Sequence, residues 1–186
     1  MQYKLTTPVV QKDLDQLRAG DTVLLSGVVY TARDAAHKRL MELLDRGEEP
    51  PFPIEDSIVY YVGPTPERPG EVIGSAGPTT SGRMDAYSPR LLDLGQAVMI
   101  GKGARNQAVK EAVVRNGAVY LAALGGAGAL MAASVKKLEV ICWEDLGCEA
   151  VRRLEVEDMP LTVILDAHGG DLYESGPAAY LEAAHG

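Results

Sequence analysis

The fold of this chain is restricted most by residues 74–85, which read Gly-Ser-Ala-Gly-Pro-Thr-Thr-Ser-Gly-Arg-Met-Asp. Three glycines and one proline rule out a regular strand there, and four Ser and Thr hydroxyls compete for backbone groups. The same residues disfavour the interior of a helix. The run is either a connecting loop or a site where backbone N–H groups, hydroxyls and the Arg83 guanidinium approach an anion. The charged residues Arg83 and Asp85 at its end favour a site.

Strand and helix patterns alternate through the middle of the chain, and strands cluster near its end. Apolar β-branched runs predict buried strands, and apolar residues at helical spacing predict helices. The expected strands are 3–7, 22–30, 57–62, 97–100, 118–124, 138–143, 150–156 and 161–166. The expected helices are 9–18, one from about 34 to Gly47, 88–94, 105–116, one reaching about 134, and 177–184. This order predicts one α/β layered domain with a mixed sheet, covering residues 1–186.

The composition is that of an acidic globular protein of 186 residues, with 46% hydrophobic residues and a formal net charge of −8. Nucleic acid is not an expected partner, because neutralising phosphates needs a basic face. No apolar run reaches about 18 residues and no signal peptide is recognisable, so neither a membrane span nor secretion by that route is expected. Two unpaired cysteines, Cys142 and Cys148, suit a reducing cytoplasm and are too few to hold a four-iron cluster.

Three cationic residues, Arg33, Arg83 and Lys102, stand at glycine-rich or strand-end positions. Arg33 follows the strand expected at 22–30, where the end of a strand and the start of a helix face the same space. A small dicarboxylate needs such a set, because a guanidinium grips one carboxylate with two hydrogen bonds while further cations neutralise the other. Each residue taken singly is more typical of an ordinary surface charge.

Two glycine-containing segments resemble nucleotide sites only superficially. Residues 95–102 have five residues between their glycines, and Gly103 stands where a P-loop has Ser or Thr. Residues 126–131 follow a strand, but Met131 occupies the third glycine position of a dinucleotide fingerprint. Close packing of a helix against a strand explains those glycines instead.

The histidines do not indicate a metal site. His37 is expected on a solvated helix face, among charged neighbours, and His168 in a turn. Neither forms a recognisable ligand pair with a cysteine. The sequence therefore predicts that this chain alone binds no metal.

Three separated motifs reveal a family resemblance. They are residues 77–85 (Gly-Pro-Thr-Thr-Ser-Gly-Arg-Met-Asp), 32–37 (Ala-Arg-Asp-Ala-Ala-His) and 100–103 (Ile-Gly-Lys-Gly). From Leu5 to about Pro177, the chain resembles the β subunit, or C-terminal domain, of iron–sulfur (class I) fumarases and L-tartrate dehydratases. The resemblance implies the swivelling β/β/α fold of that family.

The resemblance also implies roles for matching residues. Arg33, Arg83 and Lys102 would bind substrate carboxylate, and Thr79 would remove a proton from the substrate. A threonine hydroxyl is a poor base when free, so Thr79 would need nearby cations and a partner carboxylate, for which the other subunit is a candidate.

Two acidic residues are expected to support this set. Asp34 and Asp85 each lie close in sequence to a substrate arginine and would orient those guanidiniums. Ser81 stands where the family has Ser or Ala, and no chemistry is assigned to it.

The implied activity is that of a hydro-lyase: reversible hydration of fumarate to malate, or the matching dehydration of L-tartrate. The open iron of a four-iron cluster acts as the Lewis acid in that chemistry. Since this chain lacks cluster ligands, it would be a β subunit that is active only with a separate cluster-bearing α subunit, in a heterotetramer or larger assembly.

Two other hypotheses remain open at this stage. A stand-alone module that binds or senses small dicarboxylates would use the same cations without catalysis. A scaffold subunit whose glycines serve only packing predicts that Arg33, Arg83 and Lys102 lie far apart in space.

Overall fold

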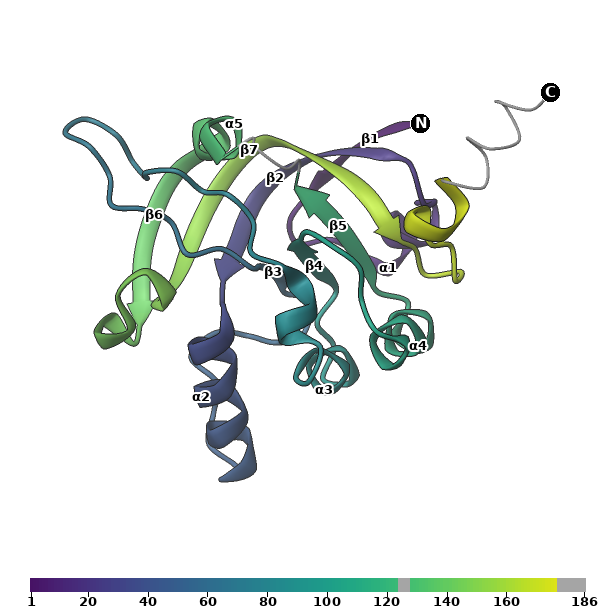
Figure 1. The fold of residues 1–186 in the computed structure, drawn as a ribbon, viewed down its shortest axis with the longest axis horizontal. Coiled ribbons are helices and arrows are strands. Elements are labelled where there is room, and N and C mark those ends of the chain that lie inside the picture. The colour runs from purple at the N-terminus through teal and green to yellow at the C-terminus, as the bar shows by residue number, and fades with distance from the viewer. Residues whose placement is uncertain (124–127, 177–186) are drawn as a thin grey trace.

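The computed structural model describes residues 1–123 and 128–176, which form a mixed sheet with helices packed on its outside (Figure 1). The strands are β1 (Gln2–Thr6), β2 (Thr22–Thr31), β3 (Ile58–Tyr60), β4 (Val98–Gly101), β5 (Val119–Ala123), β6 (Val135–Cys142) and β7 (Val151–Leu165). The helices are α1 (Gln11–Asp15), α2 (Asp34–Asp45), α3 (Ser88–Asp93), α4 (Gln107–Asn116) and α5 (Gly128–Ser134), with 3-10 turns η1 (Ser81–Met84) and η2 (Glu144–Glu149).

The sheet closes on itself. Its strand order is β1-β2-β3-β4-β5-β7-β6, and β2 also pairs with β7. Strands β2 to β5 therefore join β7 in a barrel, while β1 and β6 extend it on either side. The pairs from β1 to β5 are parallel, whereas β7 runs antiparallel to β2, β5 and β6. The predicted α/β class with a mixed sheet is confirmed.

The central strands are covered by apolar side chains on both faces, which explains why apolar and polar residues do not alternate along them. Alternate residues of β3 and β4, such as Ile58 and Ile100, face the barrel interior, while Val59 and Met99 face the helices. A parallel strand covered on both faces has no solvated side, so each residue gains by being apolar. Burying one such side chain contributes about 1.5–3 kcal/mol.

Helix α4 shows how local sequence fixes an element. The Asn106 side chain caps its start by accepting a hydrogen bond from the Val109 N–H at 3.0 Å. Gly117 ends it with φ of 62°, a left-handed conformation that glycine adopts without strain. Between these caps, Val109, Ala112 and Val113 form the buried face, close to the pattern predicted at 105–116.

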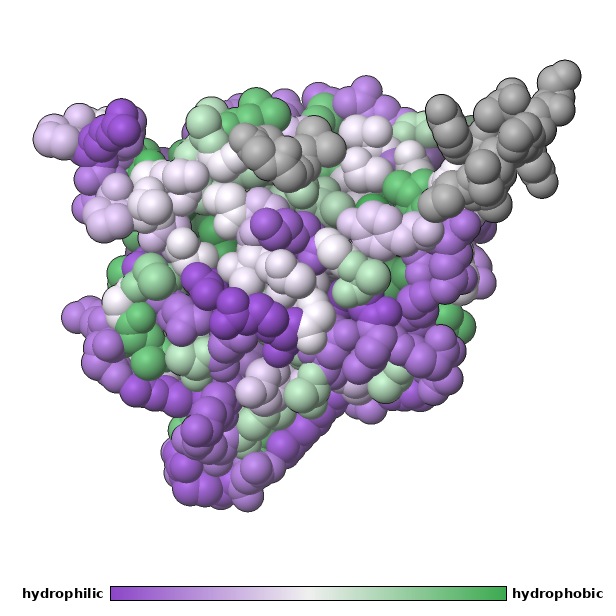
Figure 2. All heavy atoms as spheres, viewed as in Figure 1, coloured by the Kyte–Doolittle hydropathy of each residue, from purple (hydrophilic) through white to green (hydrophobic). Residues whose placement is uncertain are grey.

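The structure of helix α2 differs from the prediction for His37. Figure 2 shows hydrophilic residues over much of its outer surface, but His37 is 0% exposed and lies on the buried face with Ala36 and Leu40. The prediction that His37 is solvated is wrong, because the rings of Tyr61 and Tyr87 cover it at centroid distances of 5.4 and 5.7 Å.

Strand β7 corrects another prediction. Two strands are expected at 150–156 and 161–166, yet the structure has one, because residues 157–160 bend without leaving the sheet. Asp158 has φ of 45°, and the facing register shifts between Leu25 and Gly27. Strand β2 lines both halves of β7, while β6 and β5 pair with one half each.

The remaining differences are smaller. Helix α1 is shorter than the 9–18 helix predicted, and β6 begins at Val135 instead of 138. The helix expected at 177–184 lies outside the described residues. Among the helices that the structure describes, none combines the length and apolar character needed to cross a membrane.

Candidate active site

The predicted cationic residues lie at one edge of the sheet. The parallel strands β2, β3 and β4 end at Thr31, Tyr60 and Gly101, so their carboxyl ends meet there. Arg33 follows the first of these strands and Lys102 the third. Ligand sites in α/β proteins commonly lie at the carboxyl ends of parallel strands, where loops diverge and backbone groups become available.

Residues 74–85 cross this edge and are anchored between β3 and β4. The Thr79 N–H donates to the Tyr61 carbonyl at 2.7 Å, and the Ser81 N–H donates to the Lys102 carbonyl at 2.8 Å. Isolated bridges pair Val62 with Pro78 and Thr80 with Lys102. The run is irregular, as predicted, apart from the single 3-10 turn η1. Its backbone bonds hold Thr79, which is half-buried, beside the end of β3.

Arg33 and Arg83 meet at Asp34. Nε of Arg83 donates to Oδ1 of Asp34 at 2.8 Å, while Nη2 of Arg33 lies 3.9 Å from Oδ2. The two guanidiniums are thus neighbours, which contradicts the scaffold hypothesis for this pair. We call Arg33, Arg83 and Asp34 the clamp. It lies outside the two grooves, of about 460 and 490 Å³, that flank residues 64–75.

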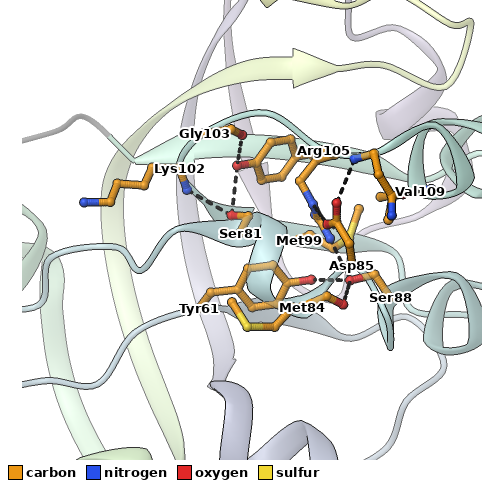
Figure 3. Close-up of polar contacts among 12 residues, drawn as sticks. Tyr61, Ser81, Met84, Asp85, Ser88, Met99, Lys102, Gly103, Arg105 and Val109 are labelled. Atoms are coloured by element: carbon orange, nitrogen blue, oxygen red, sulfur yellow. Dashed lines mark hydrogen bonds and ion pairs between the residues drawn. The ribbon is translucent and has the colours of Figure 1, made fainter.

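Lys102 joins the clamp region through its backbone. Its N–H donates to Oγ of Ser81 at 3.0 Å, so the strand end and η1 are tied together. Its side chain is exposed, and Figure 3 shows the ammonium group pointing away from the buried Arg105.

Asp85 does not orient Arg83, and that prediction is wrong. Its Oδ1 accepts from Nε of Arg105 at 2.6 Å (Figure 3). Its Oδ2 accepts from the Asn106 N–H at 2.7 Å. The Arg105 side chain is 0% exposed. Asp85 begins the turn after η1 and points inward, whereas the Arg83 side chain stays 55% exposed.

Arg105 is a buried cation outside the set of residues predicted from the sequence. Its Nη2 donates to Oγ of Ser88 at 2.7 Å, and its guanidinium lies 5.5 and 5.0 Å from the ring centroids of Tyr61 and Tyr120. Burial disfavours its charged form, but Tyr61 and Asp85 outweigh that effect and raise the pKa of Arg105. The only signal in the sequence is its position shortly after Lys102.

Ser81 has a structural contact that the sequence did not reveal. It is 0% exposed, and its hydroxyl lies 2.9 Å from that of Tyr120. The Tyr120 hydroxyl in turn donates to the Gly103 carbonyl at 2.9 Å. With the Lys102 N–H, these bonds tie η1 to the segment after β4.

Arg33 has two further neighbours. Nδ1 of His37 lies 2.9 Å from the Arg33 carbonyl, and since a carbonyl only accepts, Nδ1 carries the ring proton. Burial above all lowers the pKa of His37 to about 4, so the ring is neutral near pH 7. On the other side, Nε of Arg33 lies 3.3 Å from Oε1 of Glu149, a residue absent from the predicted set.

Comparison of the sequence with known proteins shows which family the chain belongs to. A family model described as the fumarase C-terminus matches residues 1–176. The chain belongs to this family. It is 38% identical over 177 residues to the aerobic class I fumarate hydratase of Salmonella typhimurium and 40% identical over 163 residues to the anaerobic enzyme of Escherichia coli.

The coverage differs between relatives of this fumarase C-terminus family. The matches take in 94% and 87% of this chain but only 30% of the Salmonella and Escherichia proteins. A protein of Methanocaldococcus jannaschii, provisionally assigned as L(+)-tartrate dehydratase subunit beta, is 40% identical over 172 residues, covering 89% of this chain and 88% of its own length. The chain therefore spans about a third of the fumarate hydratases and most of this relative.

The described residues do not fit an iron–sulfur cluster as its ligands. No group of three or more His, Cys, Asp or Glu side chains in ranges 1–123 and 128–176 could hold a metal ion. Cys142 and Cys148 form no disulfide, and burial raises the pKa of Cys142 to about 11, which disfavours the thiolate that binds iron.

Proposed function

We propose that this chain is the β subunit of a two-subunit iron–sulfur hydro-lyase. The reaction is the reversible hydration of fumarate to malate, or the matching dehydration of L-tartrate. The observation that carries the proposal is the clamp, in which Arg33 and Arg83 flank Asp34 at the carboxyl edge of a parallel sheet. The names of the related fumarate hydratases and of the archaeal subunit support the same class.

The clamp residues bind the substrate. Each guanidinium offers a planar fork that matches a carboxylate, so Arg33 and Arg83 suit the charge of a four-carbon dicarboxylate. Lys102, at the neighbouring strand end, adds a flexible positive charge. Asp34 keeps the two like-charged guanidiniums together and limits their motion.

Thr79 is the proposed proton-transfer residue. In the dehydration direction a proton leaves the carbon next to a carboxylate, hydroxide leaves the adjacent carbon, and the electron pair forms the double bond. The Thr79 hydroxyl accepts a proton only after losing its own, so it needs a carboxylate partner and the cations nearby. We assign that carboxylate to the partner subunit.

The cluster belongs to the partner in this proposal. A separate α subunit supplies the [4Fe-4S] cluster as Lewis acid, and this chain supplies anion binding and proton transfer. The unpaired cysteines support a cytoplasmic location, and we propose a heterotetramer or larger assembly.

Co-purification tests the proposal. The chain is expressed under anaerobic conditions with a candidate α subunit that carries the cluster cysteines, and the complex is assayed with fumarate and L-tartrate. Turnover that requires both chains is the expected result, and the better substrate settles which reaction the complex performs. Hydration by the purified single chain, or a complex that converts neither substrate, would contradict the proposal.

A further inference from the structure

Each of the two clamp arginines has a carboxylate beside its Nε. Nε of Arg83 donates to Asp34 at 2.8 Å, and Nε of Arg33 faces Oε1 of Glu149 at 3.3 Å. Within the described residues, neither arginine makes a hydrogen bond through its Nη nitrogens. Each guanidinium thus has a carboxylate beside its Nε, and its Nη nitrogens make no hydrogen bond among the described residues, although Nη2 of Arg33 also lies 3.9 Å from Oδ2 of Asp34.

Glu149 and Arg33 are packed into place. Both side chains are 22% exposed. A Cβ atom on Gly63 would lie 2.8 Å from Nη1 of Arg33 and 3.3 Å from the Cys148 carbonyl, so the glycine makes room between η2 and the end of β3. Arg33 therefore rests on backbone, with Glu149 beside it.

The polar atoms of this cluster are incompletely satisfied. Nε of Arg33, Oε1 of Glu149 and Oδ2 of Asp34 are buried and have no hydrogen-bond partner among the described residues. Buried groups left unpaired cost about 1–3 kcal/mol each, so a purely structural cluster would be expected to pair them. Buried charged groups that face one another without forming hydrogen bonds are instead expected at a site that binds a ligand.

We propose that Glu149 is a positioning residue for substrate binding. By occupying the Nε side of Arg33, it leaves only the fork between Nη1 and Nη2 for a substrate carboxylate, as Asp34 does for Arg83. Two forks held in fixed orientation favour a ligand with two carboxylates over a ligand with one. The inference rests on the proposed function, because it assigns the clamp to a dicarboxylate.

Selectivity is the property to measure, because charge and position have opposite effects. Glu149→Gln removes a negative charge, which by itself strengthens binding of every anion. If Arg33 loses its fixed orientation, in contrast, binding of a ligand with two carboxylates weakens more than binding of a ligand with one. Titration of the α/β complex with succinate and with butyrate, in wild type and Glu149→Gln, separates these effects. The ratio of succinate to butyrate affinity is expected to fall about tenfold.

A matched control is available on the same turn. Glu144 is exposed, also lies in η2, and carries the same charge, so Glu144→Gln should leave the ratio unchanged. Glu149→Asp, which keeps the carboxylate, should recover part of the succinate-to-butyrate affinity ratio that Glu149→Gln loses. An unchanged ratio in Glu149→Gln, or a rise in both affinities without loss of selectivity, would overturn the positioning role.

A second readout does not depend on the substrate. Phenylglyoxal labels accessible guanidiniums, and peptide mass spectrometry gives the rate at Arg33 and Arg83 separately. Glu149→Gln should speed labelling of Arg33 at least about threefold and leave Arg83 unchanged. If the wild-type complex binds no dicarboxylate, the proposed function fails, while labelling still decides whether Glu149 holds Arg33. Equal labelling in wild type and variant would overturn that hold.

Discussion

Arg83 is the clamp residue whose geometry is easiest to test. Its Nε is bound to Asp34 and its side chain is 55% exposed, so substitution leaves the core untouched. Arg83→Ala should lower kcat/KM of the complex about 100-fold, because a charge-assisted bond is worth about 1.5–3 kcal/mol. Arg83→Lys keeps the charge but loses the planar fork, so it should recover only a small part. Steady-state kinetics measure both.

The control for Arg83 is Arg90. It is also an exposed arginine, 43% accessible, and is paired with Asp45. Arg90→Ala should change kcat/KM less than twofold, since an exposed ion pair contributes about 0–1 kcal/mol. A similar loss in Arg83→Ala and Arg90→Ala would mean that general charge, not the clamp, governs activity.

His37 predicts how stability depends on pH. Burial lowers its pKa in the folded chain to about 4, below the ordinary 6.5, so the unfolded state takes up the proton first. The contribution of neutral His37 to the free energy of unfolding is complete above about pH 6.5. It is lost as the pH falls toward 4, by about 3 kcal/mol in total. Urea unfolding of wild type and His37→Phe across this range measures it.

The variant His37→Phe should remove this part of the pH dependence. His168, whose side chain is exposed, provides the control, and His168→Gln should keep the wild-type slope. If wild type and His37→Phe have parallel curves between pH 4 and 6.5, His37 is not buried in its neutral form.

At the scale of elements, η1 is locked against the end of β4. A Cβ atom on Gly101 would lie 1.9 Å from Oγ of Ser81 and 3.0 Å from the Tyr61 ring. Gly101→Ala should therefore reduce the free energy of unfolding by about 1–3 kcal/mol, the usual cost of overpacking. Gly82→Ala, whose nearest contact would be 3.7 Å, should have a much smaller effect in the same urea titration.

The buried pair of Arg105 and Asp85 joins η1 to the start of α4. Removing one partner of such a pair leaves an uncompensated charge and costs about 3–5 kcal/mol. Arg105→Met should lower the free energy of unfolding by an amount in this range. The double variant Arg105→Met/Asp85→Asn should lose less free energy of unfolding than the sum of the two single changes. A double-mutant cycle in urea measures the coupling, and strict additivity would show that the two side chains act independently.

For the whole molecule, the open clamp predicts dependence on the partner. Water screens the charge of the Arg83 side chain, which is 55% exposed, so the isolated chain should bind succinate at least about tenfold more weakly than the complex. Calorimetric titration of both forms tests this. Equal affinity would favour the stand-alone binding module, since the clamp would then be complete without a partner.

The sequence by itself determined the local pattern of this protein. Continuous apolar runs predicted buried strands, helical spacing predicted α2 and α4, and the glycine-rich run predicted an irregular segment. The three motifs identified the family that the comparison confirmed. These features depend on residues close together in the chain, where backbone preference and side-chain period act directly.

Only the tertiary structure decided which distant residues meet. Pairing of β2 with β7 closes the barrel and keeps β7 in the sheet on both sides of its bend at residues 157–160. The same pairing brings Glu149 of η2 beside Arg33. The same packing buries His37 and turns Asp85 toward Arg105. Such contacts join segments far apart in the chain, and no local periodicity encodes them, because their energy appears only when the layers pack together.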